Sequence, residues 1–140
     1  MFVNNMSLKF DARPQNESFA RSVVGAFCVC CNPTVDVIND IKTAISEAVT
    51  NCIVHGYENQ KNGEILIEAT IADNTLKVKI SDYGKGIVNI PQALEDFYTT
   101  REDEDRSGLG FTIMKSFMDS LEVESSLGCG TTVTMTKRLL

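Results

Sequence analysis

The segment that most constrains the fold is a long helical stretch from about Thr34 to Val54, in which apolar residues occupy nearly every face. A helix of this kind must be buried on most of its sides. Thr34 is suited to begin it, because a threonine hydroxyl can accept a bond from one of the unpaired amides of the first turn. We expect His55-Gly56 to end it, with Gly56 in the left-handed conformation that often closes a helix.

Strand signals recur along the rest of the chain. The runs 65–71 and 76–80 are rich in β-branched residues and flank Asp73-Asn74, a turn-prone pair, which predicts an antiparallel hairpin. We expect further strands at 8–12, 121–125 and 131–137, the last two joined by a turn at Gly128-Cys129-Gly130. Helices are expected at 16–27 and 108–119, and a short one near 91–96 within a mobile loop from Gly84 to Ser107.

This partial segregation of helices and antiparallel strands is typical of the α+β class. We expect an antiparallel or mixed sheet with helices packed on one face. The length of 140 residues suits one domain, spanning 1–140, with a core large enough to need no disulfide or metal.

Composition narrows the functional classes. The chain carries a formal net charge of −6, which argues against a nucleic-acid partner because phosphate binding needs clustered Lys and Arg. It has no apolar run of the roughly 20 residues that span a bilayer and no readable secretory signal, so we expect a cytoplasmic protein that does not enter the membrane.

Five cysteines, an odd number, make a disulfide framework improbable outside a secretory context. Cys28 and Cys31 have the Cys-x-x-Cys spacing of a zinc site, but no second pair follows and His55, the only histidine, lies far along the chain. The interpretation we favour is free, small buried thiols.

Glu47, Asn51 and His55 lie four residues apart and so share one stripe of the long helix. Glu47 is a candidate general base toward a hydroxyl or water, and the Asn51 side chain offers Mg²⁺ the oxygen ligand it prefers. The alternative is a solvated stripe on an otherwise buried helix, and for His55 we favour a structural role.

Two glycine motifs follow the predicted hairpin. Asp82 opens Asp-x-Gly-x-Gly at a strand end, where its carboxylate can accept a bond from an amino group such as that of adenine, while Gly84 and Gly86 allow close approach to the base. Gly108-Leu109-Gly110 precedes an apolar helix whose first amides suit polyphosphate, and Arg106 can reach a terminal phosphate. Taken alone, the Asp82 motif is better explained as ordinary turn chemistry, and the Gly108 motif is equally compatible with a flexible glycine turn and a solvated Arg106.

Common phosphate-binding patterns are absent. The chain contains neither the P-loop pattern nor Gly-x-Gly-x-x-Gly, and it lacks the His-Arg-Asp and Asp-Phe-Gly motifs of eukaryotic-type kinases.

Four motifs in order, Glu47-x-x-x-Asn51, Asp82-x-Gly84-x-Gly86, Gly108-x-Gly110 and Gly130-Thr131-Thr132, make the chain resemble the Bergerat-fold (GHKL) ATPases and kinases. That superfamily includes gyrase, the heat-shock chaperone and the histidine kinases, and it has a two-layer α/β sandwich. Within it the chain is similar to the anti-sigma-F factors of spore-forming bacteria, which are serine kinases. That closer likeness runs through Leu8-Lys9-Phe10, the segment 16–21, Ser46 to Asn51, His55-Gly56-Tyr57 and Phe111 to Met114.

The resemblance implies a homodimer that sequesters a sporulation sigma factor and phosphorylates a serine on an anti-anti-sigma protein, using ATP with Mg²⁺ and releasing ADP. It implies that Glu47 is the catalytic base, that Arg106 also has a catalytic role, that Asn51 holds the metal, and that Arg21 lies on the partner surface. The implied nucleotide-binding set is Asn51, Asp82, Gly84, Gly86, Ile87, Thr99, Thr100, Ser107, Gly108, Leu109, Gly110 and Thr131.

Within this set, the resemblance implies that Asp82 contacts adenine with Thr131 beside it, and that Thr99-Thr100 and Arg106 to Gly110 form a lid. Two residues depart from the family pattern: Tyr83 stands where an acidic residue is common, and Arg101 where lysine is common.

Three functions remain open within this resemblance. The serine kinase is favoured, because an ATPase motor needs further domains to move and a histidine autokinase needs a phosphoacceptor helix. A general-stress-type anti-sigma kinase would share the same motifs. A sigma-binding module gated by nucleotide, with incidental turnover, is the competing class.

Overall fold

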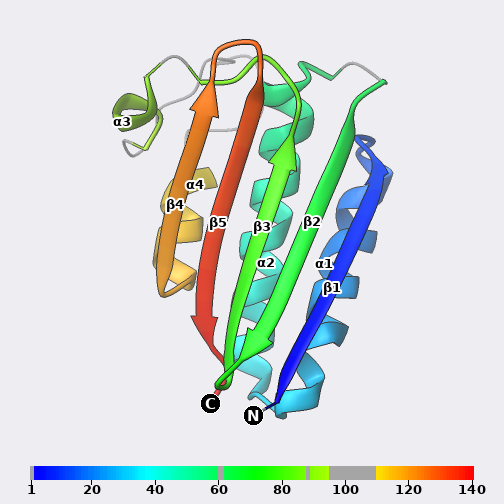
Figure 1. The fold of residues 1–140 in the computed structure, drawn as a ribbon, viewed down its shortest axis with the longest axis vertical. Helices are drawn as coiled ribbons and strands as arrows, with labels where there is room; N and C mark the ends of the chain where they lie inside the picture. Colours follow the sequence, from blue (N-terminus) through cyan, green and yellow to red (C-terminus); the bar gives the residue numbers. More distant parts are fainter. Residues whose placement is uncertain (1, 60–61, 88, 95–109) are drawn as a thin grey trace.

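The computed structural model describes residues 2–59, 62–87, 89–94 and 110–140. Its main elements, labelled as in Figure 1, are a strand β1 (Val3–Asp11), helices α1 (Gln15–Cys28) and α2 (Val35–Asn51), strands β2 (Glu64–Ala72) and β3 (Thr75–Asp82), helices α3 (Ile90–Ala93) and α4 (Gly110–Phe117), and strands β4 (Ser120–Ser126) and β5 (Gly130–Arg138). A 3-10 turn η1 (Val29–Cys31) follows α1, and a π-helical turn η2 (Cys52–Gly56) follows α2.

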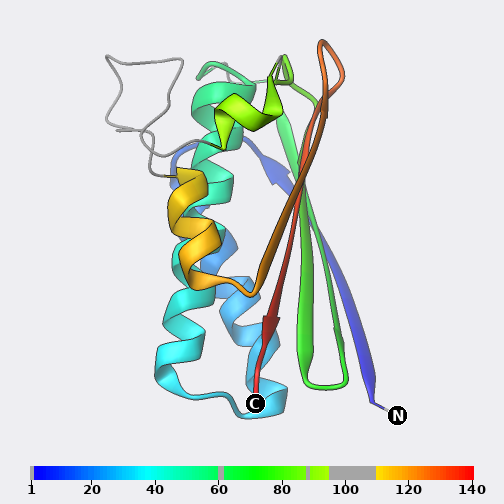
Figure 2. The same ribbon diagram turned by 90° about the vertical axis from the view of Figure 1, so that its left-hand side faces the viewer.

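The five strands form one sheet in the order β1-β2-β3-β5-β4, and every neighbouring pair is antiparallel. Figure 2 shows the helices gathered on one face of this sheet. The expected α+β sandwich with helices on one face is therefore confirmed, and of the two sheet types left open the structure has the antiparallel one.

The β2–β3 hairpin shows how the strand pattern produces this layering. Ile67 and Ile80, which face each other across the hairpin, are fully buried toward the helices, whereas the next pair along, Glu68 and Lys79, is exposed on the open face. Asp73 and Asn74 form the two-residue turn with positive φ values of 52° and 56°, as such hairpin turns require. The predicted hairpin is confirmed.

Helix α2 lies at the centre of the helical layer, packed against α1 on one side and α4 on the other (Figure 1). Its residues Ile41, Ile45 and Val49 are fully buried against the sheet core. The Thr34 hydroxyl accepts a bond from the Val37 amide at 3.2 Å, which confirms the predicted start of the helix.

The end of α2 differs from the expectation. Regular α-helix stops at Asn51, and the Tyr57 amide then donates to the Cys52 carbonyl at 2.9 Å, the five-residue spacing of a π-turn. Gly56 is not in the left-handed conformation; Glu58 and Asn59 have the positive φ values instead. The glycine is required for space, because a Cβ on Gly56 would lie 2.8 Å from Asp82 Oδ2.

Other boundaries shift by a few residues. β1 begins at Val3 rather than residue 8, because its pairing with β2 runs without interruption from Val3 opposite Ala72. The short helix near 91–96 is α3, and the helix expected over 108–119 begins, within the described residues, at Gly110. None of the helices described is long and apolar enough to cross a bilayer.

Candidate functional site

The candidate site lies where β3 ends beside the last turn of α2 and the first turn of α4. Asp82 is the last residue of β3, and its register partner on β5 is Thr131. Asn51 is the last residue of α2, and its side-chain amide lies against Gly110, the first residue of α4. The fold therefore brings described residues from all four sequence motifs together at one end of the sheet.

Asp82 is a buried acceptor. Its side chain is 5% exposed, and its Oδ1 accepts the Gly84 amide at 2.9 Å. Burial raises the pKa of this carboxyl, while bonds from the Gly84 amide, the Cys52 thiol and the Thr131 amide pull it back down. A carboxylate held this way suits a ligand that brings a hydrogen-bond donor, such as an exocyclic amino group.

Gly84 and Gly86 have a packing role that the sequence did not predict. A Cβ on Gly84 would lie 2.1 Å from the Gly56 carbonyl oxygen, and one on Gly86 would lie 2.2 Å from that of Ser126. Gly86 also has a φ of +80°. Both glycines are therefore needed for the loop to pack against its own protein neighbours. Their approach to a base stays a prediction.

Ser125 ties this loop to the sheet. Its hydroxyl accepts the Ile87 amide at 2.7 Å and lies 2.9 Å from both the Gly130 carbonyl oxygen and the Thr131 hydroxyl. Ile87 and Thr131, two predicted nucleotide contacts, are thus held by one side chain of β4.

Tyr57 holds the other side of the loop that follows Asp82. Its phenol oxygen accepts the Tyr83 amide at 2.7 Å and donates to the Glu64 carbonyl at 2.5 Å. This single hydroxyl joins the end of the π-turn to both strands of the hairpin beside Asp82. Burial raises the pKa of this phenol, so it remains a donor at neutral pH. Tyr83, the first departure from the family pattern, is itself 61% exposed.

Glu47 and Asn51 lie one turn apart on α2 and are both half-buried, as a stripe lining a cleft would be. A Cβ on Gly110 would lie 3.0 Å from both Oδ1 and Nδ2 of Asn51, so the amide reaches the start of α4. The donor chemistry of Asn51 fits a hard cation at this place. His55 lies within the π-turn, where the four-residue spacing of the stripe no longer holds.

Part of the predicted site lies outside the described residues: Thr99, Thr100, Arg101, Arg106, Ser107, Gly108 and Leu109. The lid assignment and the catalytic role of Arg106 therefore remain predictions.

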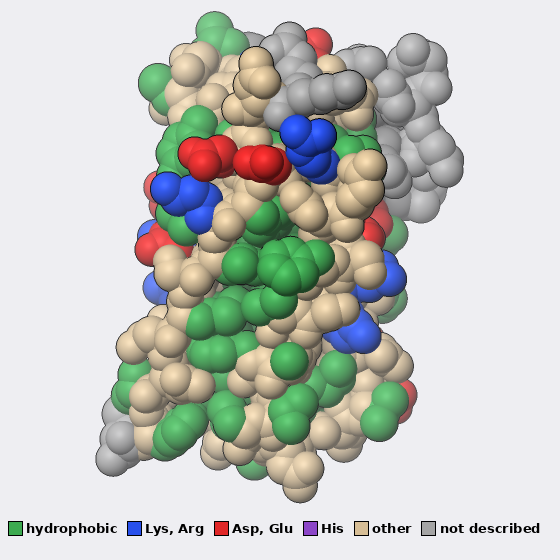
Figure 3. Space-filling view, turned by 90° about the vertical axis from the view of Figure 1, so that its right-hand side faces the viewer, with side chains coloured by type: hydrophobic (Ala, Val, Ile, Leu, Met, Phe, Trp, Pro, Cys, Tyr) green, Lys and Arg blue, Asp and Glu red, His purple; other side chains and the backbone are tan. Residues whose placement is uncertain are grey.

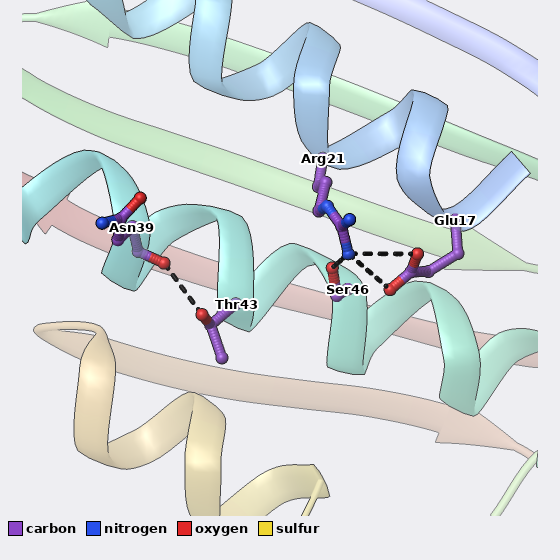
Figure 4. A network of polar contacts seen from close by, with 5 residues as sticks. All are labelled: Glu17, Arg21, Asn39, Thr43 and Ser46. Carbon is purple, nitrogen blue, oxygen red and sulfur yellow. Dashed lines mark hydrogen bonds and ion pairs between the residues drawn. The ribbon is translucent and has the colours of Figure 1, made fainter. Parts of the chain in front are cut away.

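Arg21 lies away from this cluster, on α1, yet it contacts the same central helix. Its Nη1 donates to both carboxylate oxygens of Glu17, at 3.2 and 3.4 Å, and to the Ser46 hydroxyl at 3.4 Å (Figure 4). Ser46 directly precedes Glu47. The predicted partner-binding residue Arg21 therefore contacts the residue next to the predicted base.

The cysteines are all free. Cys28 and Cys52 are buried as expected, but Cys30 and Cys129 are exposed, so the expectation of uniformly buried thiols is wrong for these two. Among the described residues, no three His, Cys, Asp or Glu side chains converge as a metal site.

Three contributors were missed from the sequence: Cys52, Tyr57 and Ser125. In the sequence, Cys52 looks like one more apolar residue of the long predicted helix, and Ser125 looks like an ordinary strand residue. Tyr57 could have been singled out, because it belongs to the His55-Gly56-Tyr57 segment of the family resemblance. Its role, however, depends on contacts with residues that are distant in sequence.

Comparison with known proteins indicates the family of the chain. Residues 10–137 match the model of the histidine kinase-like ATPase domain. The anti-sigma F factor of Thermoanaerobacter sp. strain X514 is 55% identical over 97% of this chain and 94% of its own length, and that of Clostridium botulinum strain Eklund 17B is 52% identical over 99% and 96%. A crystal structure of the RsbU and RsbW domains of a Mycobacterium tuberculosis protein matches 97% of this chain and 32% of its own, with a TM-score of 0.70 and 22% identity.

Proposed function

Because the chain belongs to the anti-sigma F factors of the histidine kinase-like ATPase family, we propose that it binds and sequesters a sporulation sigma factor of the sigma-F type. We further propose that it is an ATP-dependent protein serine kinase that inactivates an anti-anti-sigma protein in the cytoplasm. The observation that carries the proposal is the convergence of Asn51, Gly110, Asp82 and Thr131 at one end of the sheet, with Glu47 one turn away.

The roles follow from the chemistry of each side chain. The Asp82 carboxylate accepts a hydrogen bond from the adenine amino group, and Thr131 and Ile87 lie beside the base. Asn51 offers its amide oxygen to Mg²⁺ as a ligand. Bound Mg-ATP supplies the transferable phosphoryl group. Glu47 accepts the proton of the acceptor serine hydroxyl, a group too weakly acidic to lose it unaided.

The phosphate-binding part of the proposal extends from Gly110. Ser107 to Gly110 would wrap the phosphates at the start of α4, Arg106 would face the terminal phosphate, and Thr99-Thr100 would complete the lid. Transfer of a phosphoryl group is mostly a matter of positioning and of neutralising charge, so these residues would do as much for the rate as the base.

We also propose that the protein is a homodimer joined at the β1 edge of the sheet. β1 is a nine-residue edge strand with one lysine and no proline, so it carries little of the protection that usually prevents edge pairing. Exposed apolar side chains gather on the face at this edge (Figure 3). Phe2, Val3 of β1 and Phe19 of α1 are exposed hydrophobic residues. Phe19 packs edge-on against Phe10 of β1, with ring centroids 6.4 Å apart.

A transfer assay tests the enzymatic proposal. The purified chain is incubated with γ-labelled Mg-ATP and a panel of anti-anti-sigma proteins, and each acceptor is compared with a variant whose candidate serine is replaced by alanine. We expect label on a serine of one acceptor and no label after chelation of Mg²⁺. Sigma binding without any transfer would instead favour a nucleotide-gated binding module. Transfer only to a stress-type acceptor would favour the general-stress kinase.

A further inference from the structure

We infer that Ser125 is a positioning residue for nucleobase selection: its hydroxyl orients the Thr131 hydroxyl so that Thr131 meets the base as a hydrogen-bond acceptor. The inference rests on the proposed nucleotide site and adds to it a residue that acts through Thr131 without touching the base. It concerns the place where β4 ends and β5 begins, beside Asp82.

Asp82, Thr131 and Ser125 form one row across the sheet. Asp82 on β3 is the register partner of Thr131 on β5, which is in turn the partner of Ser125 on β4. Two positions along the strands, Ile80 and Val133 are buried in the core under the helices, so the side chains of this row face the helices as well. Thr131 therefore lies between Asp82 and Ser125, on the face where we propose that the nucleotide binds.

The contacts of Ser125 use every hydrogen-bonding position of its hydroxyl. A serine hydroxyl has one proton to donate and two lone pairs that can accept. The Ile87 amide, at 2.7 Å, can only donate, so it occupies one lone pair. The Gly130 carbonyl oxygen, at 2.9 Å, can only accept, so it takes the single proton. The second lone pair is what remains for the Thr131 hydroxyl, which also lies at 2.9 Å.

This count fixes the proton of Thr131. Because Thr131 must donate to Ser125, its proton points toward β4 and its own lone pairs are left for a ligand beside Asp82. Adenine presents an amino group with two protons at C6. The Asp82 carboxylate can accept one of them, and an acceptor next to it suits the other, or a water molecule bound there. Hypoxanthine presents a carbonyl oxygen at C6, which needs a donor, so the orientation set by Ser125 favours adenine.

Calorimetry with the magnesium complexes of ATP and of inosine triphosphate tests this role. Ser125→Ala frees the Thr131 hydroxyl to turn and donate, so we expect the ratio of ATP affinity to inosine triphosphate affinity to fall about three- to tenfold. Ser125→Thr keeps a hydroxyl on a side chain that suits a strand, and it should retain the wild-type ratio. Ser120→Ala is the matched control and should also retain that ratio. Ser120 faces Thr136 across the same two strands, with the hydroxyl oxygens 2.5 Å apart, at the end far from Asp82.

A double variant separates orientation of Thr131 from loss of a merely structural contact, which would weaken both nucleotides alike. In a Thr131→Val background there is no hydroxyl to orient, so Ser125→Ala should leave the ratio of the two affinities unchanged. An unchanged ratio in Ser125→Ala alone would overturn the inference. A fall in the ratio that persists undiminished in the Thr131→Val background would overturn it as well.

Neutron diffraction from crystals of deuterated, nucleotide-free wild type locates the two hydroxyl deuterons directly. We expect the deuteron of Ser125 on the line to the Gly130 carbonyl oxygen and that of Thr131 on the line to the Ser125 oxygen. A Ser125 deuteron aimed at Thr131 would refute the inference, even if Ser125→Ala does not fold. Wild-type protein that binds neither nucleotide would refute the proposed function, whereas the deuterons would still show whether Ser125 orients Thr131.

Discussion

The side-chain amide of Asn51 lies against the backbone of Gly110, which joins the last residue of α2 to the first residue of α4 across about 60 positions of sequence. A methyl group on Gly110 would come within 3.0 Å of both polar atoms of that amide. Asn51, the candidate metal ligand, and Gly110, at the candidate phosphate-binding helix terminus, are therefore in contact. We expect a substitution at one of them to displace the other.

Gly110→Ala should weaken Mg-ATP binding about tenfold, because the added methyl pushes the Asn51 amide out of place. Calorimetric titration of the variant with Mg-ATP measures the effect. Gly25→Ala is the control: it is also a helical glycine, but its Cβ would meet the flexible side chain of Lys42 at 3.2 Å and Ile38 at an ordinary 3.9 Å. Equal affinity in Gly110→Ala and wild type would show that the contact is not used in binding.

The fold was largely predictable because its signals are local. The apolar α2 sequence, the Thr34 cap and the Asp73-Asn74 turn each specify an element through neighbouring residues alone. Errors arose where tertiary contacts decide. β1 is longer than its alternating pattern suggests because β2 pairs with it throughout, and Gly56 is selected by the nearness of Asp82 rather than by its own φ.

The candidate site was predictable only in part. Asp82 and Asn51 were predicted from residue type and position and Thr131 from the family resemblance, and the fold places the three at one end of the sheet. The residues that hold Asp82 and its loop, Cys52 and Ser125, have no distinctive spacing in the sequence. Their role depends on a π-turn and on a cross-strand contact, neither of which leaves a local pattern.

Glu47→Gln should retain ATP and sigma-factor binding while lowering phosphoryl transfer by about 100-fold or more, because the amide has similar shape but cannot accept the serine proton. Single-turnover transfer and a separate nucleotide titration distinguish the two effects. Thr43→Val, one turn earlier on the same helix and exposed, controls for surface substitution on α2. Full transfer activity in Glu47→Gln would rule out the base role.

The nucleotide-free protein should show a pH dependence that comes from Asp82. Burial raises its pKa in the folded state above the ordinary 3.8, so the folded protein binds this proton more tightly than the unfolded chain. The free energy of unfolding therefore contains a contribution that is present below pH 3.8 and is lost as pH rises through the folded-state pKa.

Urea unfolding of wild type and Asp82→Asn at pH 4 and pH 7 measures this contribution. Relative to the variant, which cannot ionise at this position, wild type should lose stability between the two pH values. Asp36→Asn, an exposed carboxylate at the start of α2, reports the effect of the same substitution at the surface. A stability difference between wild type and Asp82→Asn that grows in favour of wild type with pH would contradict the assigned sign.

Phe19→Asp should raise the dissociation constant of the homodimer at least about tenfold, because two charged side chains would replace two partly exposed aromatic rings beside the β1 edge. Sedimentation velocity over a concentration series measures the change. Leu127→Asp places the same charge on a more exposed apolar residue in the turn between β4 and β5, at the opposite edge of the sheet. Dimerisation lost equally in both variants would place the interface elsewhere.

Arg21→Glu should weaken sigma-factor binding by about 2 kcal/mol, roughly 30-fold, without changing the affinity for ATP. In the free protein Arg21 forms an ion pair with Glu17, four residues earlier on α1. The substitution replaces this cation with a second carboxylate one helical turn from Glu17, so the surface would repel an acidic group of the sigma factor instead of attracting it. Biolayer interferometry with immobilised sigma factor measures the loss. Arg13→Glu makes the same charge change on a more exposed arginine just before α1 and should bind nearly as wild type. Because Arg21 also contacts Ser46 beside Glu47, a parallel loss of ATP affinity in Arg21→Glu would instead assign this arginine to the support of α2.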